Sequence, residues 1–263
     1  MKKLLSFLFS LILLFCTIGL VGCGANDNST VGVIYKLSSD ESYAEVVGYE
    51  GETTDVIIAQ NFKNKPVKTI REGAFKDLEI TSITIPNSVI NVGKGAFENC
   101  YYIKSMAIPF IGGSKEDATK DYLGYIFGAD THYHNGDYVP SALKTIILGD
   151  SETEISDYAF NNCAYIKNIE IPNSVLSIGS YAFSGCSALQ SIEIPKSVTK
   201  IGVYAFINCY ALTQVHIDPM SIWRKTTNET DWNNKTGGAF VDVENPLNNA
   251  GALRNSFYYW YKV

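Results

Sequence analysis

The sequence predicts a repeat solenoid that is rich in short strands and has little helix. Within residues 67–217 an Ala-Phe pair recurs five times, at residues 74–75, 96–97, 159–160, 182–183 and 205–206, and the last three pairs are in strict 23-residue register. A Cys follows four of these pairs at the same spacing, at Cys100, Cys163, Cys186 and Cys209. A 23-residue unit cannot bury a core of its own, so the units are expected to stack on one another.

Each unit carries a short segment whose first, fourth and sixth residues are apolar. Alternation of this kind predicts a short strand with one buried face. A Pro follows four of the segments and ends the strand. The segments are ITSITIP (80–86), IKSMAIP (103–109), LKTIIL (143–148), IKNIEIP (166–172), LQSIEIP (189–195) and LTQVHI (212–217).

A period of this length with L-x-x-L-x-L spacing is typical of leucine-rich repeats. The consensus C-x-x-L-x-x-I-x-I-P-x-S-V-x-x-I-G-x-x-A-F-x-x-C closely resembles the BspA-like (Treponema-type) class over about residues 64–217. The resemblance implies a right-handed leucine-rich-repeat superhelix. It places an N-terminal β cap at residues 32–66 and repeats at 67–217.

Two segments interrupt or end the repeat. Residues 110–141 are an insertion that widens the Ala-Phe interval from 23 to 63, which equals one missing Ala-Phe half-coil plus a loop. Residues 218–263 show no repeat and hold all three Trp residues. Solenoids need a terminal cap, so we expect an irregular C-terminal cap there, with helical character only around Pro246 to Leu253.

The N-terminus has the design of a secretory signal. Lys2 and Lys3 precede an apolar run, and small residues follow it. Leu20-Val21-Gly22-Cys23 resembles the lipobox of bacterial lipoproteins, which implies a signal peptide over 1–22, lipidation of Cys23 and a tether over 23–31. A plain secreted protein and a retained transmembrane anchor are the alternatives. The lipobox implies an extracytoplasmic protein, lipid-anchored to a bacterial membrane or cell surface.

The four repeat cysteines are spaced by 63, 23 and 23 residues, so each occupies the same place in its coil. Free Cys is among the most buried residue types, and we predict a ladder of buried thiols. Disulfides and a metal site are the alternatives.

The outward strand positions form two columns on the expected concave face. One is Ser82, Ser105, Thr145, Asn168, Ser191 and Gln214, and the other is Thr84, Ala107, Ile147, Glu170, Glu193 and His216. The first is rich in hydrogen-bonding groups and the second becomes acidic toward its C-terminal end. We predict a shallow surface for protein or glycan on Asn168, Glu170, Ser191, Glu193, Gln214 and His216. An ordinary solvated strand face is the alternative.

A further column consists of Tyr158, Tyr181 and Tyr204, each one residue before an Ala-Phe pair. Exposed tyrosines are well suited to contact a binding partner because they are large, rigid and amphipathic. Mutual packing on the outer side of the solenoid is the alternative.

The sequence gives little support for a catalytic or metal-binding site. The insertion contains one metal-like cluster, Asp130, His132, His134 and Asp137, but its spacing matches no metal motif, and we expect neither a metal nor a cofactor. Glu170 and Glu193 lie one coil apart, which superficially fits the carboxylate pair of a retaining glycosidase. We nevertheless predict that the protein is not an enzyme.

Net charge excludes one class of partner. The formal charge is −6, and removing Lys2 and Lys3 leaves 19 basic against 27 acidic side chains, a charge of −8. Nucleic acid requires clustered basic residues and is not expected.

We predict a cell-surface lipoprotein that is anchored to the membrane through lipid. Its solenoid would bind an extracellular or host protein, matrix or polysaccharide. A structural envelope component is the alternative, and a glycan-acting enzyme is the third possibility.

Overall fold

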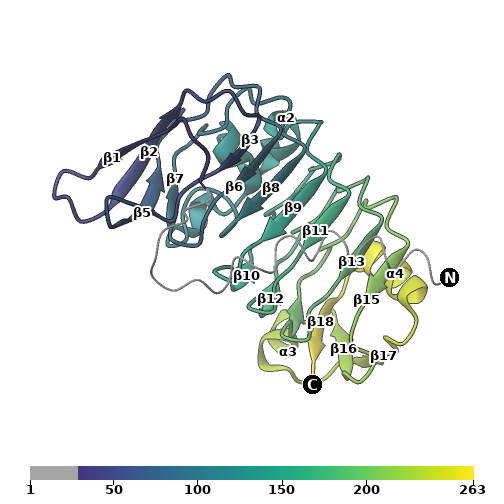
Figure 1. Cartoon of the computed structure of the whole chain (residues 1–263). Coiled ribbons are helices and arrows are strands. Elements are labelled where there is room, and N and C mark those ends of the chain that lie inside the picture. Colours follow the sequence, from purple (N-terminus) through teal and green to yellow (C-terminus); the bar gives the residue numbers. More distant parts are fainter. Residues whose placement is uncertain (1–28) are drawn as a thin grey trace, which may run out of the picture.

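A computed structural model describes residues 29–263 as a solenoid of stacked coils (Figure 1). Strands dominate and helices are few and short, which confirms the predicted fold class. The predicted signal peptide and the lipidation of Cys23 fall outside the described residues. Within residues 29–263, no helix is both long enough and apolar enough to span a membrane.

The N-terminal end is a small sheet that merges with the first coil. Its strands are β1 (Val33–Leu37), β2 (Ala44–Tyr49), β4 (Asn61–Phe62), β5 (Lys65–Ile70) and β7 (Asn91–Val92). The β1–β2 and β4–β5 pairs are antiparallel, whereas β5 is parallel to both β2 and β7. Because β7 belongs to a repeat, this sheet joins the N-terminal hairpin to the coils without a break.

Seven short strands line one face of the solenoid, which we call the main sheet. They are β3 (Asp55–Ile57), β6 (Ser82–Thr84), β8 (Ser105–Ile108), β9 (Thr145–Leu148), β11 (Asn168–Glu170), β13 (Ser191–Glu193) and β15 (Gln214–His216). The first five form one parallel ladder, and β13 and β15 form a second one. The central residue of each predicted strand is buried, as the alternation requires, from Ile83 to Val215.

A second set of strands lies on another side of each coil and ends in the C-terminal cap. The parallel strands β10 (Glu154–Ile155), β12 (Ser177–Ile178) and β14 (Lys200–Ile201) are followed by antiparallel strands of the cap. The cap strands are β16 (Trp223–Thr226), β17 (Ala239–Val241) and β18 (Tyr259–Lys262), and β18 pairs directly with β14.

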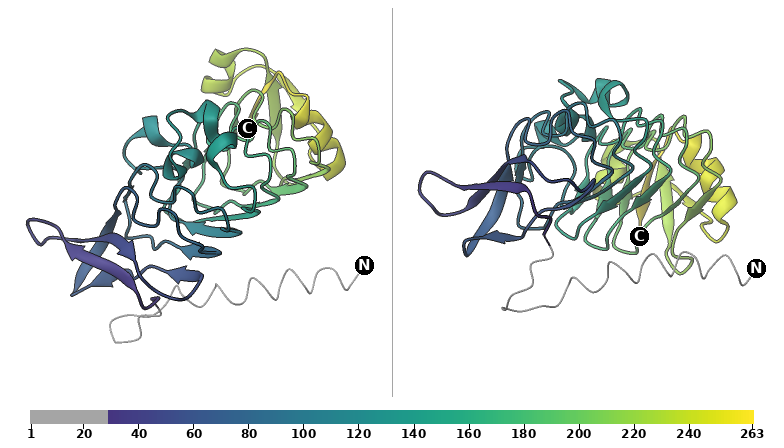
Figure 2. Two further views of the ribbon diagram at one scale, coloured as in Figure 1. Left: turned by 90° about the horizontal axis from the view of Figure 1, so that it is seen from above. Right: turned by 45° about the horizontal axis from the view of Figure 1, so that its top comes forward.

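The cap closes the end of the core (Figure 2). Helix α4 (Pro246–Arg254) confirms the predicted helical segment, and its Asn249 side chain donates to the Val215 carbonyl of β15 at 3.1 Å. A second helix, α3 (Glu229–Asn234), was not expected. Its six residues include a single apolar side chain, Trp232, so they give no periodicity, and the helix is started instead by the Asn228 side chain.

The interior is built on ladders of phenylalanine and cysteine. Phe160, Phe183 and Phe206 stack with ring centroids 5.4 and 5.0 Å apart. The four repeat cysteines are free and buried, which confirms the predicted thiol ladder. Three of the thiols donate to a Phe carbonyl of the preceding coil, as Cys209 does to Phe183 at 3.0 Å. Burial raises the pKa of Cys209 to about 12, which disfavours its thiolate form at neutral pH.

The insertion contains one turn of the solenoid whose sequence lacks the Ala-Phe pair. β8 and β9 pair directly, so the main sheet continues past residues 110–141. Within the insertion, Ile126 and Phe127 occupy the Ala-Phe place, because the Phe97 N–H donates to the Ile126 carbonyl just as the Phe75 N–H donates to that of Ala96. The helical turns of the insertion are η1 (Ala118–Lys120), η2 (Leu123–Phe127), η3 (His132–His134) and α2 (Asn135–Tyr138).

The residue before each Ala-Phe pair adopts a left-handed backbone. In the first two turns this residue is Gly73 or Gly95, with φ of 65° and 63°. In the last three it is Tyr158, Tyr181 or Tyr204, with φ of 61°, 57° and 57°. Positive φ is uncommon for a bulky residue, so the repeat imposes this conformation on the tyrosines.

Candidate binding surface

The predicted outward columns lie on the main sheet and are most accessible at its C-terminal end. In β11, β13 and β15 both outward positions are exposed, which places all six predicted side chains in solvent: Asn168, Glu170, Ser191, Glu193, Gln214 and His216. In β6, β8 and β9 the corresponding positions are half-buried. The C-terminal half of the main sheet is therefore the more open half.

A pocket lies at the carboxyl ends of β13 and β15. Glu193 and His216 face each other across the parallel register. The pocket has a volume of about 540 Å³, and its wall also includes Asn173 and the ion pair between Lys196 and Asp218, whose charged atoms are 3.7 Å apart. The sequence columns identified Glu193 and His216, whereas the other three residues come from turns that follow the strands. The pocket thus offers an acid, an imidazole and an amide within one polar surface.

Glu170 and Glu193 lie on neighbouring strands that belong to separate ladders. Although Glu170 is exposed as a residue, neighbouring atoms partly desolvate its carboxyl and raise the pKa of that group. Glu193 alone of the two lines the pocket. The structure therefore does not bring the two carboxylates into one pocket.

The tyrosine column has the geometry of mutual packing. Tyr158, Tyr181 and Tyr204 are half-buried, and successive ring centroids are 5.0 Å apart. His132 stacks on one end at 4.3 Å, and Phe257 meets the other end edge-on at 5.4 Å. The column follows the second set of strands and does not join the main sheet. Contact of these tyrosines with a partner stays a prediction.

Two residues of the metal-like cluster in the insertion have other partners. Asp130 pairs with Lys94, and this partner lowers the pKa of the Asp130 carboxyl. His132 packs against Tyr158, and burial lowers the pKa of its imidazole. Among residues 29–263, no group of three or more His, Cys, Asp or Glu side chains has an arrangement that could hold a metal ion.

A set of exposed tyrosines was missed from the sequence. They are Tyr101, Tyr102, Tyr165 and Tyr210. Each follows a repeat Cys by one or two residues, so the register of the repeat was the signal that could have found them. They lie in the turn that leads into the main sheet.

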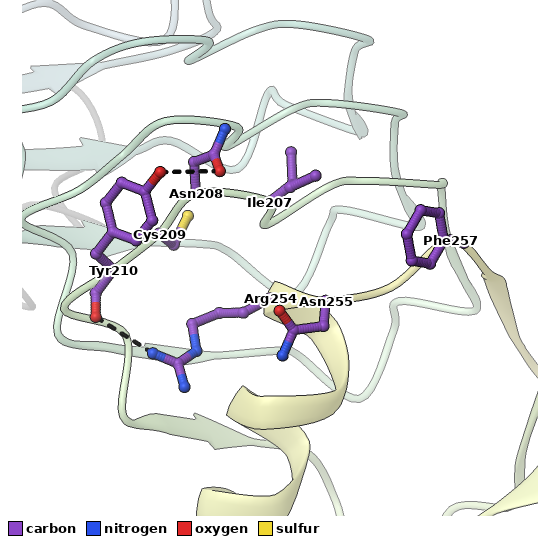
Figure 3. Close-up of a pocket in the computed structure, with 7 residues that line it drawn as sticks. All are labelled: Ile207, Asn208, Cys209, Tyr210, Arg254, Asn255 and Phe257. Carbon is purple, nitrogen blue, oxygen red and sulfur yellow. Dashed lines mark hydrogen bonds between the residues drawn. The ribbon is translucent and has the colours of Figure 1, made fainter.

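A second pocket lies between the last coil and the cap (Figure 3). It has a volume of about 370 Å³ and is lined by Ile207, Asn208, Cys209, Tyr210, Arg254, Asn255 and Phe257. The Arg254 guanidinium donates to the Tyr210 carbonyl at 3.2 Å, and the Tyr210 hydroxyl contacts the Asn208 side chain at 3.1 Å. These contacts join the cap to the repeat.

The chain belongs to the BspA-type leucine-rich repeat family. The family model matches six copies over residues 55–113 and 138–227, and the gap falls within the insertion. Membership in this repeat family indicates a scaffold for interaction. A search of curated proteins found no match.

Solved structures with similar folds come from several bacteria. A leucine-rich cell surface protein of Faecalibacterium prausnitzii is 21% identical, with a TM-score of 0.46, over 86% of this chain and 63% of that one. A leucine-rich repeat protein of T. pallidum is 22% identical, with a TM-score of 0.37, over 73% and 72% of the two chains. One from Bacteroides ovatus is 23% identical, with a TM-score of 0.37, over 76% and 54%. The chain thus spans less than two thirds of the Faecalibacterium and Bacteroides proteins.

Proposed function

We propose that this protein is a lipid-anchored surface protein whose solenoid binds a protein or glycan outside the cell. The observation that carries the proposal is the exposed C-terminal half of the main sheet, with the polar pocket at Glu193 and His216. An array of hydrogen-bonding side chains on a rigid sheet is suited to recognition because its geometry is fixed before a partner arrives. Cys23 would supply the anchor, and dual or triple acylation would hold the chain stably at a membrane.

A structural envelope component is the second candidate, and the packed tyrosine column favours it. A column that stacks internally contributes to the rigidity of the solenoid and leaves less aromatic surface for a partner. An enzymatic role has weaker support. The repeat thiols are buried, and Glu170 does not share the pocket of Glu193.

The test uses the full-length chain, purified in mild detergent, on arrays of extracellular-matrix proteins and of glycans. The binding variant is Glu193→Gln with His216→Asn, and the matched control is Glu50→Gln with His134→Asn, which changes exposed residues outside the pocket. We expect a saturable partner whose binding falls at least tenfold in the first variant and is unchanged in the second. Absence of any partner on both arrays would contradict the proposal and favour the envelope component.

Anchoring is tested separately by the variant Cys23→Ser. We expect the wild-type chain to stay with the membrane fraction and the variant to be released or to accumulate unprocessed. A variant that fractionates with the membrane in processed form would overturn the lipid anchor but leave the binding surface untouched.

A further inference from the structure

Three lysines form a row at the amino ends of neighbouring main-sheet strands. Lys104, Lys144 and Lys167 each directly precede the first residue of β8, β9 or β11, and these strands are parallel and in register. The Lys144 N–H donates to the Lys104 carbonyl, and the Lys167 N–H to the Lys144 carbonyl, both at 2.9 Å. Adjacent strands are about 4.8 Å apart, so the three side chains leave the backbone at that spacing. We call this set the lysine row.

Among the described residues the lysine row has no ion-pair partner, although Asp55 attracts Lys104 electrostatically and the Lys144 ammonium donates to the Ser141 carbonyl. Asp55 lies near Lys104, but its carboxylate accepts hydrogen bonds from the hydroxyls of Ser82 and Thr81, at 2.7 and 2.9 Å. Glu170 lies at the opposite end of β11 from Lys167. Like charges on adjacent strands repel, and an anionic ligand would relieve that repulsion.

Exposed aromatic rings border the lysine row. Tyr101, Tyr102 and Tyr165 are 65%, 55% and 50% exposed, and all three lie in the turn just before the row. The Lys144 ammonium lies 4.9 Å from the centre of the Tyr165 ring, which places charge and ring in one surface. Flat amphipathic rings of this kind can stack against the C–H face of a sugar.

The outward residues next to the row are hydrogen-bonding side chains, namely Ser105, Thr145 and Asn168. An acidic protein segment would bring apolar anchor side chains that require a pocket. Neither of the two pockets described above includes a residue of the lysine row. A hydroxyl-rich chain with regularly spaced negative groups matches the row better than a peptide does.

We propose that the lysine row and its tyrosines bind a linear anionic polysaccharide with carboxylate or sulfate groups on its sugars. The inference rests on the proposed function, and it names the chemical class of one partner. The polymer lies along the stacking direction of the coils, its negative groups contact Lys104, Lys144 and Lys167, and its rings stack on Tyr102 and Tyr165.

The experiment measures binding of the full-length chain, in mild detergent, to immobilised dextran sulfate, polygalacturonate, neutral dextran and polyglutamate. Dextran sulfate and dextran share a backbone and differ in charge, and polyglutamate carries the charge without sugar rings. The row variant changes Lys104, Lys144 and Lys167 to Gln. The matched control changes Lys36, Lys65 and Lys115 to Gln, which removes the same charge from exposed sites elsewhere.

We expect binding to dextran sulfate, to polygalacturonate or to both, a loss of at least tenfold in the row variant, and less than twofold in the control. Which polymer binds distinguishes sulfate from carboxylate as the recognised group. The double variant Tyr102→Ser with Tyr165→Ser should lose at least threefold on the same polymer, because charge alone does not explain a ring contact. Raising the salt concentration to 0.5 M should weaken binding, since exposed charges are screened.

Three results would overturn the inference: no binding to either anionic polysaccharide, equal losses in the row and control variants, or equally tight binding to polyglutamate that the tyrosine variant leaves unchanged. The last result would assign the row to acidic protein segments. If the inference fails while the chain still binds a matrix protein or a neutral glycan on the arrays, the proposed function stands. If no partner of any class binds, both fail.

Discussion

The first two Ala-Phe turns and the last three have the same backbone and the same interior phenylalanine ladder but different outer surfaces. Inside, Phe75 stacks on Phe97 at 5.2 Å, much as Phe183 stacks on Phe206 at 5.0 Å. Outside, the left-handed position is glycine in the first two turns and tyrosine in the last three. A side chain in this conformation costs roughly 1–2 kcal/mol, and each stacked aromatic pair contributes roughly 0.5–1.5 kcal/mol. The repeat therefore preserves a conformation and not a residue type, and the stacked rings offset the strain.

The shared interior gives the largest expected effect. Phe97→Ala in the glycine region and Phe183→Ala in the tyrosine region should each destabilise the protein by about 3–5 kcal/mol, because each removes a fully buried ring. Urea unfolding followed by circular dichroism measures both. A cost below about 1 kcal/mol at either site would show that the two ladders are not equivalent.

Glu152 lies at the junction of the two regions and gives a pH-dependent effect. Burial raises the pKa of its carboxyl to about 7, although the carboxylate accepts the Ile111 N–H at 2.7 Å. Between about pH 4.5 and pH 7 the native state holds a proton that the unfolded state has lost, so stability falls as pH rises through this window. The total loss is at most about 3–4 kcal/mol, since one pKa unit is worth about 1.4 kcal/mol.

The variant Glu152→Gln isolates this contribution. It keeps an acceptor for the Ile111 N–H and removes the charge, so its stability should fall less between pH 5 and pH 7.5 than that of the wild type. Urea unfolding at both pH values measures how far the unfolding free energy of each protein falls between pH 5 and pH 7.5. An equal fall in the wild type and the variant would show that Glu152 titrates normally in the folded protein.

Substitutions of Tyr181 distinguish the cost of backbone strain from the contribution of ring stacking. Tyr181→Ala removes two stacked pairs and keeps a side chain at positive φ, so it should cost about 2 kcal/mol. Tyr181→Gly loses the same stacking but relieves the strain, and its cost should be smaller by about 1 kcal/mol. The reciprocal control, Gly95→Ala, should cost about 1 kcal/mol. Thermal unfolding compares the three, and a Gly variant less stable than the Ala variant would contradict the strain argument.

The smallest effect is expected at an exposed tyrosine. Tyr102 is solvent-exposed, unlike the stacked Tyr181, and Tyr102→Ser should change the unfolding free energy by no more than about 0.5 kcal/mol. The same unfolding measurement tests it. A larger loss would mean that the turn tyrosines stabilise the fold and would weaken their assignment to a binding surface.

Much of the fold followed from the sequence because each coil repeats one pattern of burial. Met106, Ile146 and Ile192 are buried where the alternation places them, and the repeat thiols are where their register predicts. The widened interval predicted one half-coil without an Ala-Phe pair, but its residues, Ile126 and Phe127, were not identified because the larger Ile replaces Ala and no Cys follows. Helix α3 escaped because a side-chain cap, not apolar periodicity, starts it.

The candidate site was predictable only where it lies on regular strands. Alternation identifies Glu193 and His216, since it fixes which strand residues face outward. Asn173, Lys196 and Asp218 reach the same pocket from turns, whose paths depend on packing between coils. The packed state of Tyr158 also depends on a long-range neighbour, His132, which lies in the insertion and has no place in the repeat.

The 23-residue register of the last three turns also determines how this molecule can grow. A tandem duplication of 23 codons within residues 159–205 would add one coil that finds the same ring, thiol and strand partners as its neighbours, and would lengthen the solenoid by about 4.8 Å. The terminal strand β18 would then pair with the new last short strand as it now pairs with β14. The turn at Ile126–Phe127 cannot be copied in this way, because it is supported by the buried Asn135 side chain, which lies outside the repeat. That side chain accepts the Gly124 N–H and donates to the Tyr158 carbonyl. Duplication by recombination can therefore lengthen the C-terminal half of the solenoid but not the insertion.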